Sequence, residues 1–158
     1  MSGTAALTDA ARAVMRVAHE RRSADDVPGG SAAIRAITLG TLRWYLRLAP
    51  AIGRLLTRPS APMAPAVHAL LVTAAHQIVY SRNAPEGVVD AAVDATRALG
   101  APRASGFVNA LLRRFVREQA DIFAAIDADP AVRHAHPRWF VAALEREQPQ
   151  RHDDILAG

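Results

Sequence analysis

The chain has 158 residues, of which 51% are apolar, and it contains no cysteine. This length is enough for one ordinary domain with a real hydrophobic core. The lack of cysteine excludes disulfides, thiolate metal ligands and a cysteine nucleophile within this chain. The sequence has no run of about eighteen apolar residues and no secretory leader, so we expect a cytoplasmic protein without a membrane span.

The charge of the chain is basic and unevenly distributed. All 19 basic residues are Arg, and the formal net charge is +4. A GC-rich coding bias is the simplest explanation for the absence of Lys. The planar guanidinium of Arg suits phosphate even if coding bias is the reason for its use. Residues 1–60 carry nine Arg against four acids, whereas residues 120–158 carry four Arg against seven acids. A basic body with an acidic end fits a polyanionic partner for the body.

Apolar residues recur at helical spacing from the start of the chain. We expect a first helix over residues 6–21, capped by Thr8 or Asp9, because both side chains can accept a hydrogen bond from the first turn. A second helix should begin at Ser31. Its apolar residues spread around much of its circumference, which predicts burial on two sides.

The middle of the chain continues the helical pattern. Pro50 is expected to bend the chain before a short third helix around residues 52–56. The stretch 67–79 is the most apolar and should form the central helix. Residues 88–99 should form the next helix, which Gly100 ends as a C-cap.

The most specific stretch of the sequence is RASGFVNALLRRFVR, at residues 103–117. Its apolar stripe at helical spacing comprises Phe107, Leu111, Leu112 and Phe115. Arg113, Arg114 and Arg117 fall on the flank and back of this stripe. Asn109 interrupts a run of good helix formers, and we expect its side chain to bond the backbone of a neighbouring loop or helix end.

The helical pattern runs on through Ile126, and Asp129-Pro130 and His136-Pro137 start two further helices. We find no alternating strand pattern and no internal repeat. The sequence therefore predicts an all-α fold.

The sequence shows no active site. His68 and His76 are eight residues apart on one helix, and His134 and His136 lie without an acidic residue or Cys at ligand spacing, so we expect no metal. The glycines are scattered and form no phosphate-binding loop.

The arginines are the remaining candidates. Arg12 and Arg16, on the first helix, would form one phosphate-facing patch with Arg113, Arg114 and Arg117 if the two helices are neighbours. The alternative is a set of solvated surface side chains, and the sequence favours neither.

A second candidate strip lies in the second helix. Arg43 and Arg47 are four residues apart beside Trp44, whose ring could stack on a base. The simpler interpretation of Trp44 is a core or half-buried residue.

Three features of the sequence resemble the NusB-type helical domain: the stretch AAHQIVYSRNAP, the block VVDAAVDATRALGAPRASGFVNALLRR, and the spacing between them. The following segment, HPRWFVAALEREQP, resembles a helix that follows the NusB-like domain in ribosomal RNA cytosine-5-methyltransferases of the RsmB (Sun or Fmu) type. The residues that carry the resemblance as a structural signature are Phe107, Asn109, His136, Pro137 and Trp139.

The resemblance implies a compact bundle of about seven helices with an RNA-facing side. It assigns residues 6–128 to an RNA-binding domain, and residues 129–158 to a helical extension that leads to a catalytic domain absent from this chain. S-adenosylmethionine is expected only for that catalytic domain, so we expect no cofactor in this chain and no catalysis by it alone.

Three functions stay open. The leading hypothesis is a domain that holds ribosomal RNA for a small-subunit 5-methylcytosine methyltransferase, with arginines on the phosphates. The second is a protein-binding module of the kind used in NusB-type transcription antitermination, and the third is a domain that only packs on its own catalytic domain. The expected partners are ribosomal RNA and the protein's own C-terminal methyltransferase domain. We expect a monomer, with a dimer as the alternative.

Overall fold

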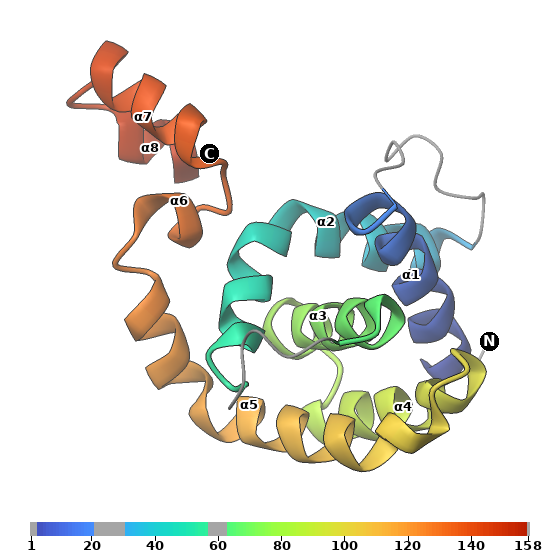
Figure 1. Ribbon diagram of the computed structural model, residues 1–158. Coiled ribbons are helices and arrows are strands. Elements are labelled where there is room, and N and C mark those ends of the chain that lie inside the picture. The colour runs from blue at the N-terminus through green and yellow to red at the C-terminus, as the bar shows by residue number, and fades with distance from the viewer. Residues whose placement is uncertain (1–2, 21–30, 57–62, 158) are drawn as a thin grey trace.

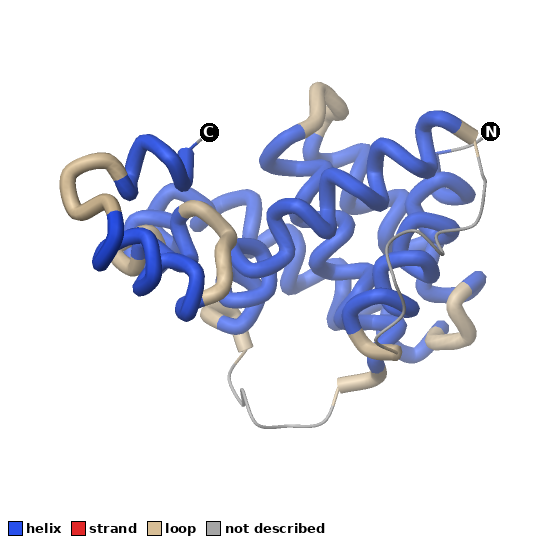
Figure 2. The backbone as a smooth tube through the Cα atoms, turned by 90° about the horizontal axis from the view of Figure 1, so that it is seen from above, coloured by secondary structure: helices blue, strands red, loops and turns tan. Residues whose placement is uncertain are grey.

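The computed structural model describes residues 3–20, 31–56 and 63–157. Within these ranges the chain forms only helices, turns and loops (Figure 2). The elements are α1 (Gly3–Ala18), α2 (Ala32–Gly53), α3 (Pro65–Tyr80), α4 (Pro85–Ala98), a 3-10 turn η2 (Pro102–Ala104), α5 (Ser105–Ile126), α6 (Pro130–Arg133), α7 (Arg138–Glu147) and α8 (His152–Ala157). The predicted all-α fold is confirmed: about seven helices were expected, and the described residues form eight α-helices. No helix in the described part is long and apolar enough to cross a membrane.

Helix α3 is the centre of the bundle, and α1, α2, α4 and α5 surround it (Figure 1). Every residue from Ala69 to Ile78 is buried. This run is almost continuously apolar, so the helix has no polar face to turn towards water. Three alanines within the run allow neighbouring helices to approach closely. The prediction that residues 67–79 form the central helix is confirmed.

The first helix begins earlier than the sequence suggested. Because α1 starts at Gly3, Thr8 and Asp9 lie inside the helix, and the prediction that one of them caps it is wrong. The Thr8 hydroxyl instead donates to the carbonyl oxygen of Thr4 at 2.7 Å. Ala18 ends α1, and the expected end at Arg21 lies outside the described residues.

Helix α2 begins at the predicted place, and Ser31 is its N-cap. Its hydroxyl oxygen accepts a hydrogen bond from the backbone N–H of Ile34 at 3.2 Å. The predicted bend at Pro50 with a separate third helix is wrong, because α2 runs through Pro50 to Gly53. Pro50 removes one helical N–H, yet the buried residues on either side keep this part of the helix packed on the core.

The outer side of α2 faces water. Leu39 and Leu46 are each 43% exposed, so the predicted burial of α2 on two sides is also wrong. Helix α2 packs against α1, α3 and α5, and among the described elements the short helix α6 also contacts it.

Helices α6, α7 and α8 project from one side of the bundle (Figure 1). They have a small core of their own, in which Ala131, Val141 and Leu156 are buried. The guanidinium of Arg43 on α2 donates to the carbonyl oxygen of His134 at 3.1 Å and links this part to the bundle. The domain boundary expected at residues 128 and 129 stays a prediction.

Candidate nucleic-acid interface

Helix α5 carries the largest group of candidate residues, and its inner face attaches it to the bundle. Val108, Leu112 and Phe115 are fully buried. Phe107, which the sequence placed on this stripe, is 44% exposed, so that part of the prediction is wrong. Residues four apart share a helix face, so the spacing fits a buried pair Phe107 and Leu111 as well as a buried pair Val108 and Leu112. In the structure the buried face of α5 is centred on the second pair.

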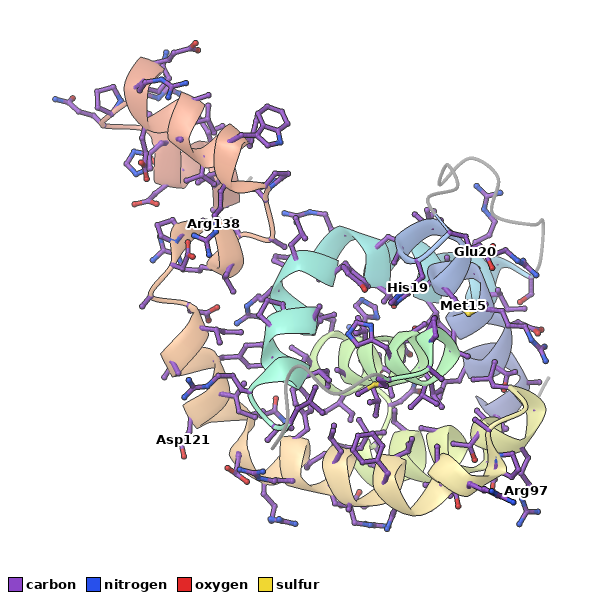
Figure 3. The ribbon with its side chains drawn as sticks, viewed as in Figure 1. Met15, His19, Glu20, Arg97, Asp121 and Arg138 are labelled. Carbon is purple, nitrogen blue, oxygen red and sulfur yellow. The ribbon has the colours of Figure 1, made fainter. Side chains whose placement is uncertain are left out.

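The solvent-facing side of α5 presents the three predicted arginines. Arg113, Arg114 and Arg117 are all exposed. Their spacing places them within little more than one helical turn, over about 6 Å of the axis. Helix α5 runs along the lower edge of Figure 3, from the end of α4 marked by Arg97 towards Asp121. The cationic flank is present, and its use in RNA binding stays a prediction.

Asn109 holds the guanidinium of Arg113. Its side-chain oxygen accepts a hydrogen bond from Arg113 Nε at 2.9 Å. The prediction that Asn109 bonds backbone of a neighbouring loop or helix end is therefore wrong, because the partner is a side chain one turn away on the same helix. Arg113 Nη2 also lies 3.7 Å from a carboxylate oxygen of Asp90 on α4, which is itself well exposed.

Arg114 is held along the helix. Its Nε donates to Glu118 Oε2 at 2.6 Å, and its Nη1 lies 3.5 Å from the carbonyl oxygen of Leu55. Arg117 has no hydrogen-bond or ion-pair partner among the described residues. Ion pairs between exposed side chains contribute only about 0–1 kcal/mol. Phosphates could therefore replace the partners of Arg113 and Arg114 at little cost.

The arginines of α1 lie apart from this group. Arg12 Nη2 donates to the carbonyl oxygen of Ala98 at 2.7 Å, where it satisfies a backbone acceptor at the C-terminal end of α4. Arg16 is half-buried one turn further along. The main neighbours of α1 are α2, α3 and α4, and α4 lies between α1 and α5 (Figure 1). The structure thus groups Arg113, Arg114 and Arg117, and places Arg12 and Arg16 elsewhere.

Two further arginines were missed by the sequence reasoning. Arg97, in the last turn of α4, and Arg103, in η2, are exposed and have no side-chain partner within the described ranges. Both flank the short connection between α4 and α5. The signal available in the sequence was their position on either side of the Gly100–Pro102 connection, which the periodicity argument did not use.

Trp44 is a packing residue. Its ring stacks on Tyr80 with centroids 4.9 Å apart and planes 15° apart. The guanidinium of Arg43 lies 4.3 Å from the Trp44 ring centroid. These contacts support the simpler interpretation of Trp44, because the ring already has an aromatic partner and a cation next to it.

Arg47 joins α2 to the C-terminal end of α5. It forms a two-pronged contact with Asp127, at 3.0 and 2.8 Å, and donates to the Tyr80 hydroxyl at 2.6 Å. Its guanidinium also lies 3.9 Å from the Phe123 ring centroid. The hydrogen bond to Asp127 is the main cause that raises the pKa of Arg47. Arg47 is therefore committed to the fold and is not available to RNA.

The histidines form no metal centre. In the described part of the chain no three side chains of His, Cys, Asp or Glu come together as metal ligands. His19, just after α1 (Figure 3), has its Nε2 3.2 Å from Nδ1 of His68. Burial, with a smaller contribution from His19, lowers the pKa of His68. His76 is buried, and burial lowers its pKa to about 4.

The C-terminal signature residues lie at the start of α7. His136 Nε2 lies 3.3 Å from the carbonyl oxygen of Leu156 on α8. Pro137 immediately precedes the first residue of α7. Trp139 is 73% exposed, the highest value among the exposed large hydrophobic side chains of the described residues.

An open groove of about 410 Å³ is lined by residues of α1, α2 and α4, with Gln77 of α3. Leu7, Ile37 and Val88 supply much of its apolar lining, and Gln77 and Asn83 supply polar groups. The described residues that line the groove carry no charge. It is unsuited to phosphate.

Residues 5–117 match the NusB family. The chain belongs to this family. The match covers α1 to α4 and more than half of α5, so the NusB region includes all five arginines predicted to bind RNA. Helices α6 to α8 lie beyond the matched residues.

Three similar proteins share one description. A ribosomal RNA small subunit methyltransferase B from Pseudomonas putida is 36% identical over 121 residues, which cover 77% of this chain and 28% of the relative. The protein of the same description from Pseudomonas syringae pv. tomato is 34% identical over 77% of this chain and 27% of the relative. That from Escherichia fergusonii is 29% identical over 79% of this chain and 29% of the relative. The NusB region thus spans less than a third of the length of these relatives.

Proposed function

We propose that this chain is the RNA-binding domain of a small-subunit ribosomal RNA cytosine-5-methyltransferase. In this proposal, the arginine face of α5 holds the RNA backbone while a separate domain carries out methyl transfer. The observation that carries the proposal is the exposed group Arg113, Arg114 and Arg117 on a helix whose other side is fixed in the core. The printed description of the relatives supplies the substrate class.

The geometry of α5 suits backbone contacts. Asn109 holds the guanidinium of Arg113, so part of its side-chain entropy is already lost before RNA arrives, whereas Glu118 would give up Arg114 to a phosphate. The planar guanidinium can bind a phosphate through two parallel hydrogen bonds. Contacts to phosphate position the nucleic acid without reading its sequence, so recognition would depend on the shape of the RNA.

Arg12 and Arg16 have a secondary role in this proposal. Arg12 is engaged at the end of α4, so its contribution to RNA binding would require that it exchange a backbone carbonyl for a phosphate. Arg16 has no such bond among the described residues and is the better candidate of the two for a peripheral contact.

Catalysis is assigned to the separate domain. We propose that S-adenosylmethionine binds there, because this sequence offers neither cysteine nor a glycine-rich phosphate loop. The relatives are more than three times as long as the matched region, which leaves room for such a domain. Residues 129–158 would form the connection, and the protein would act as a monomer in the cytoplasm.

The test is the salt dependence of RNA affinity for the wild type and for Arg113→Ala/Arg114→Ala. For single-stranded RNA each phosphate contact contributes a slope of about 0.7 in log affinity against log salt. The double variant should therefore lower the slope by about 1.4. Arg35→Ala, which removes an exposed arginine near the start of α2, is the matched control and should leave the slope unchanged.

An unchanged slope in the double variant would show that α5 does not contact phosphate. The alternative function is a NusB-type protein-binding module. It would be favoured if the wild type had no RNA affinity at low salt and instead formed a stable complex with a protein partner.

A further inference from the structure

The C-terminal helices expose large apolar side chains. Trp139 on α7 is 73% exposed and Ile155 on α8 is 40% exposed, and they are two of the five exposed large hydrophobic side chains among the described residues. Trp139 lies about 200° around the helix from Val141, the buried residue of α7. The indole ring therefore points away from the small core that α6, α7 and α8 share. Phe140 meets this ring only edge-on, with centroids 5.9 Å apart.

The core shared by these three helices is small. It has three buried residues, Ala131, Val141 and Leu156, with Phe140 and Leu144 partly buried against it. Segments of fewer than about 40 residues seldom fold on a core of their own without disulfides, metals or a partner. The bundle supports this part mainly through the contact between α2 and α6. Covering the exposed side of α7 would therefore add apolar burial that this part lacks.

Ion pairs hold the three helices to one another. Arg138, at the start of α7, pairs with Asp129 at the N-terminal end of α6 (Figure 3). Arg133 Nη2, on α6, lies 3.0 Å from Oδ1 of Asp153 on α8. The hydrogen bond from α2 to the C-terminal end of α6 continues these contacts to the bundle. The side of α7 that carries Trp139 thus has a defined orientation relative to the bundle.

The charge of this part favours a protein over RNA as the molecule that covers Trp139. Residues 120–158 carry four Arg against seven acidic residues, and such a surface repels a polyanion. Two alanines follow Trp139 within about one turn on the same side of α7. Arg146, two turns further along this side, has Glu145 and Glu147 as its neighbours in the chain. A tryptophan on a largely apolar helix side is a common anchor of protein–protein contacts.

The size of this surface favours a partner on the same chain. Stable complexes of separate proteins bury roughly 1,200–2,000 Å², whereas one aromatic side chain buries about 150–250 Å². A tethered domain can use a smaller contact, because its effective concentration is in the millimolar range. Such a domain exists in the relatives. The match covers 77% of this chain but only 28% of the Pseudomonas putida relative, of which the NusB region is an N-terminal domain.

We propose that Trp139 and its side of α7 dock the C-terminal domain of the same protein, to which methyl transfer is assigned above. The inference rests on the proposed function, and it adds that residues 129–158 form a docking surface as well as a connection. Docking would hold the arginine face of α5 at a fixed distance from the catalytic centre. An RNA bound to α5 would then reach that centre in one orientation.

The test is hydrogen–deuterium exchange, followed by mass spectrometry, of this chain and of the full-length protein. The amides of residues 138–147 should exchange about 30-fold more slowly in the full-length protein, the effect of one interface hot spot on local opening. Trp139→Ala in the full-length protein should return their exchange to the rate in this chain. Peptides from α3 should exchange alike in all three samples, because α3 is buried within the bundle.

Two further variants separate docking from other effects. Trp139→Phe keeps an aromatic ring and should retain most of the protection of α7. Leu39→Ala removes an exposed apolar side chain on α2 and should leave the protection unchanged. Thermal unfolding followed by circular dichroism should show that Trp139→Ala keeps the wild-type fold in this chain, since the ring is largely exposed. The salt slope of RNA binding should not change in Trp139→Ala, because no arginine is lost.

Equal exchange of α7 in this chain and in the full-length protein would overturn the inference, and so would protection that persists in Trp139→Ala. Protection of α7 in this chain that rises with protein concentration would assign the surface to a second copy. Protection that appears only when RNA is added would assign it to RNA, and either result contradicts the inference. All of these outcomes leave the proposed function intact if Arg113→Ala/Arg114→Ala still lowers the salt slope. A full-length protein without RNA affinity would refute the proposed function, whatever the exchange of α7.

Discussion

Replacing Asp127 with Ala should destabilise the bundle, because Arg47 would lose its carboxylate partner in a largely buried position. The Arg47 and Asp127 side chains are only 16% and 24% exposed. Breaking a fully buried ion pair costs about 3–5 kcal/mol, whereas exposed pairs contribute about 0–1 kcal/mol. Arg47 keeps its bond to the Tyr80 hydroxyl, so we expect an intermediate loss of about 2 kcal/mol in the free energy of unfolding. For a chain of this length that corresponds to a melting temperature lower by about 4–8 °C.

The assay is urea unfolding followed by far-ultraviolet circular dichroism, which does not depend on the nearby Trp44. Arg47→Met keeps an apolar side chain against Phe123, and together with Asp127→Ala it completes a double-mutant cycle. We expect a coupling energy of about 1–2 kcal/mol. Glu118→Ala, which breaks the exposed pair with Arg114, is the matched control and should cost less than about 0.5 kcal/mol. A coupling energy near zero, or equal losses for Asp127→Ala and Glu118→Ala, would refute the reasoning.

Two further predictions concern the packing of α2 on α3. Burial lowers the pKa of His76 to about 4, against about 6.5 when unfolded, so unfolding binds a proton as the pH falls. The free energy of unfolding should be at its maximum above about pH 6.5 and should decrease by at most about 3 kcal/mol towards pH 4. His76→Gln should flatten this part of the curve of urea midpoint against pH. An identical pH profile in the variant would contradict the assignment. Gly40→Ala would place a Cβ 2.7 Å from the His76 ring, so it should destabilise by about 1–3 kcal/mol despite better helix propensity. Gly87→Ala, which meets no atom within 4 Å, should stabilise by about 0.5–1 kcal/mol; melting temperatures that move in the same direction for both variants would count against this packing.

The fold class and the central helix could be predicted because they depend on local pattern. The largely apolar run in α3 leaves the helix no polar face for water, so burial on all sides follows. The start of α2 at Ser31 could be predicted because the Ser31 hydroxyl acts on its own neighbours. Such features need no knowledge of other segments.

The errors arose where tertiary packing decides between equal local choices. Phe107 and Val108 fit the spacing of α5 equally well, and only the position of the core selects Val108. Pro50 predicts a break in the helix, yet the buried contacts of the surrounding residues keep α2 continuous. Helix α1 begins at Gly3, five residues before Thr8, because the apolar stripe alone does not fix where a helix starts.

The candidate site could be predicted only in part. The three arginines of α5 share one face by helical geometry alone, and that could be read from the sequence. The roles of Arg12 and Arg47 could not, since their partners Ala98 and Asp127 are more than seventy residues away along the chain. Long-range contacts of this kind decide which arginines are structural and which remain available.

The most direct test of the central claim is the salt dependence of wild-type binding to single-stranded RNA, between about 50 and 200 mM salt. Three phosphate contacts from Arg113, Arg114 and Arg117 predict a slope of about −2 in log affinity against log salt. A slope of that size, reduced to about −0.7 in Arg113→Ala/Arg114→Ala, would support an RNA-holding face on α5. A slope near zero, or no measurable binding at the low-salt end, would contradict it.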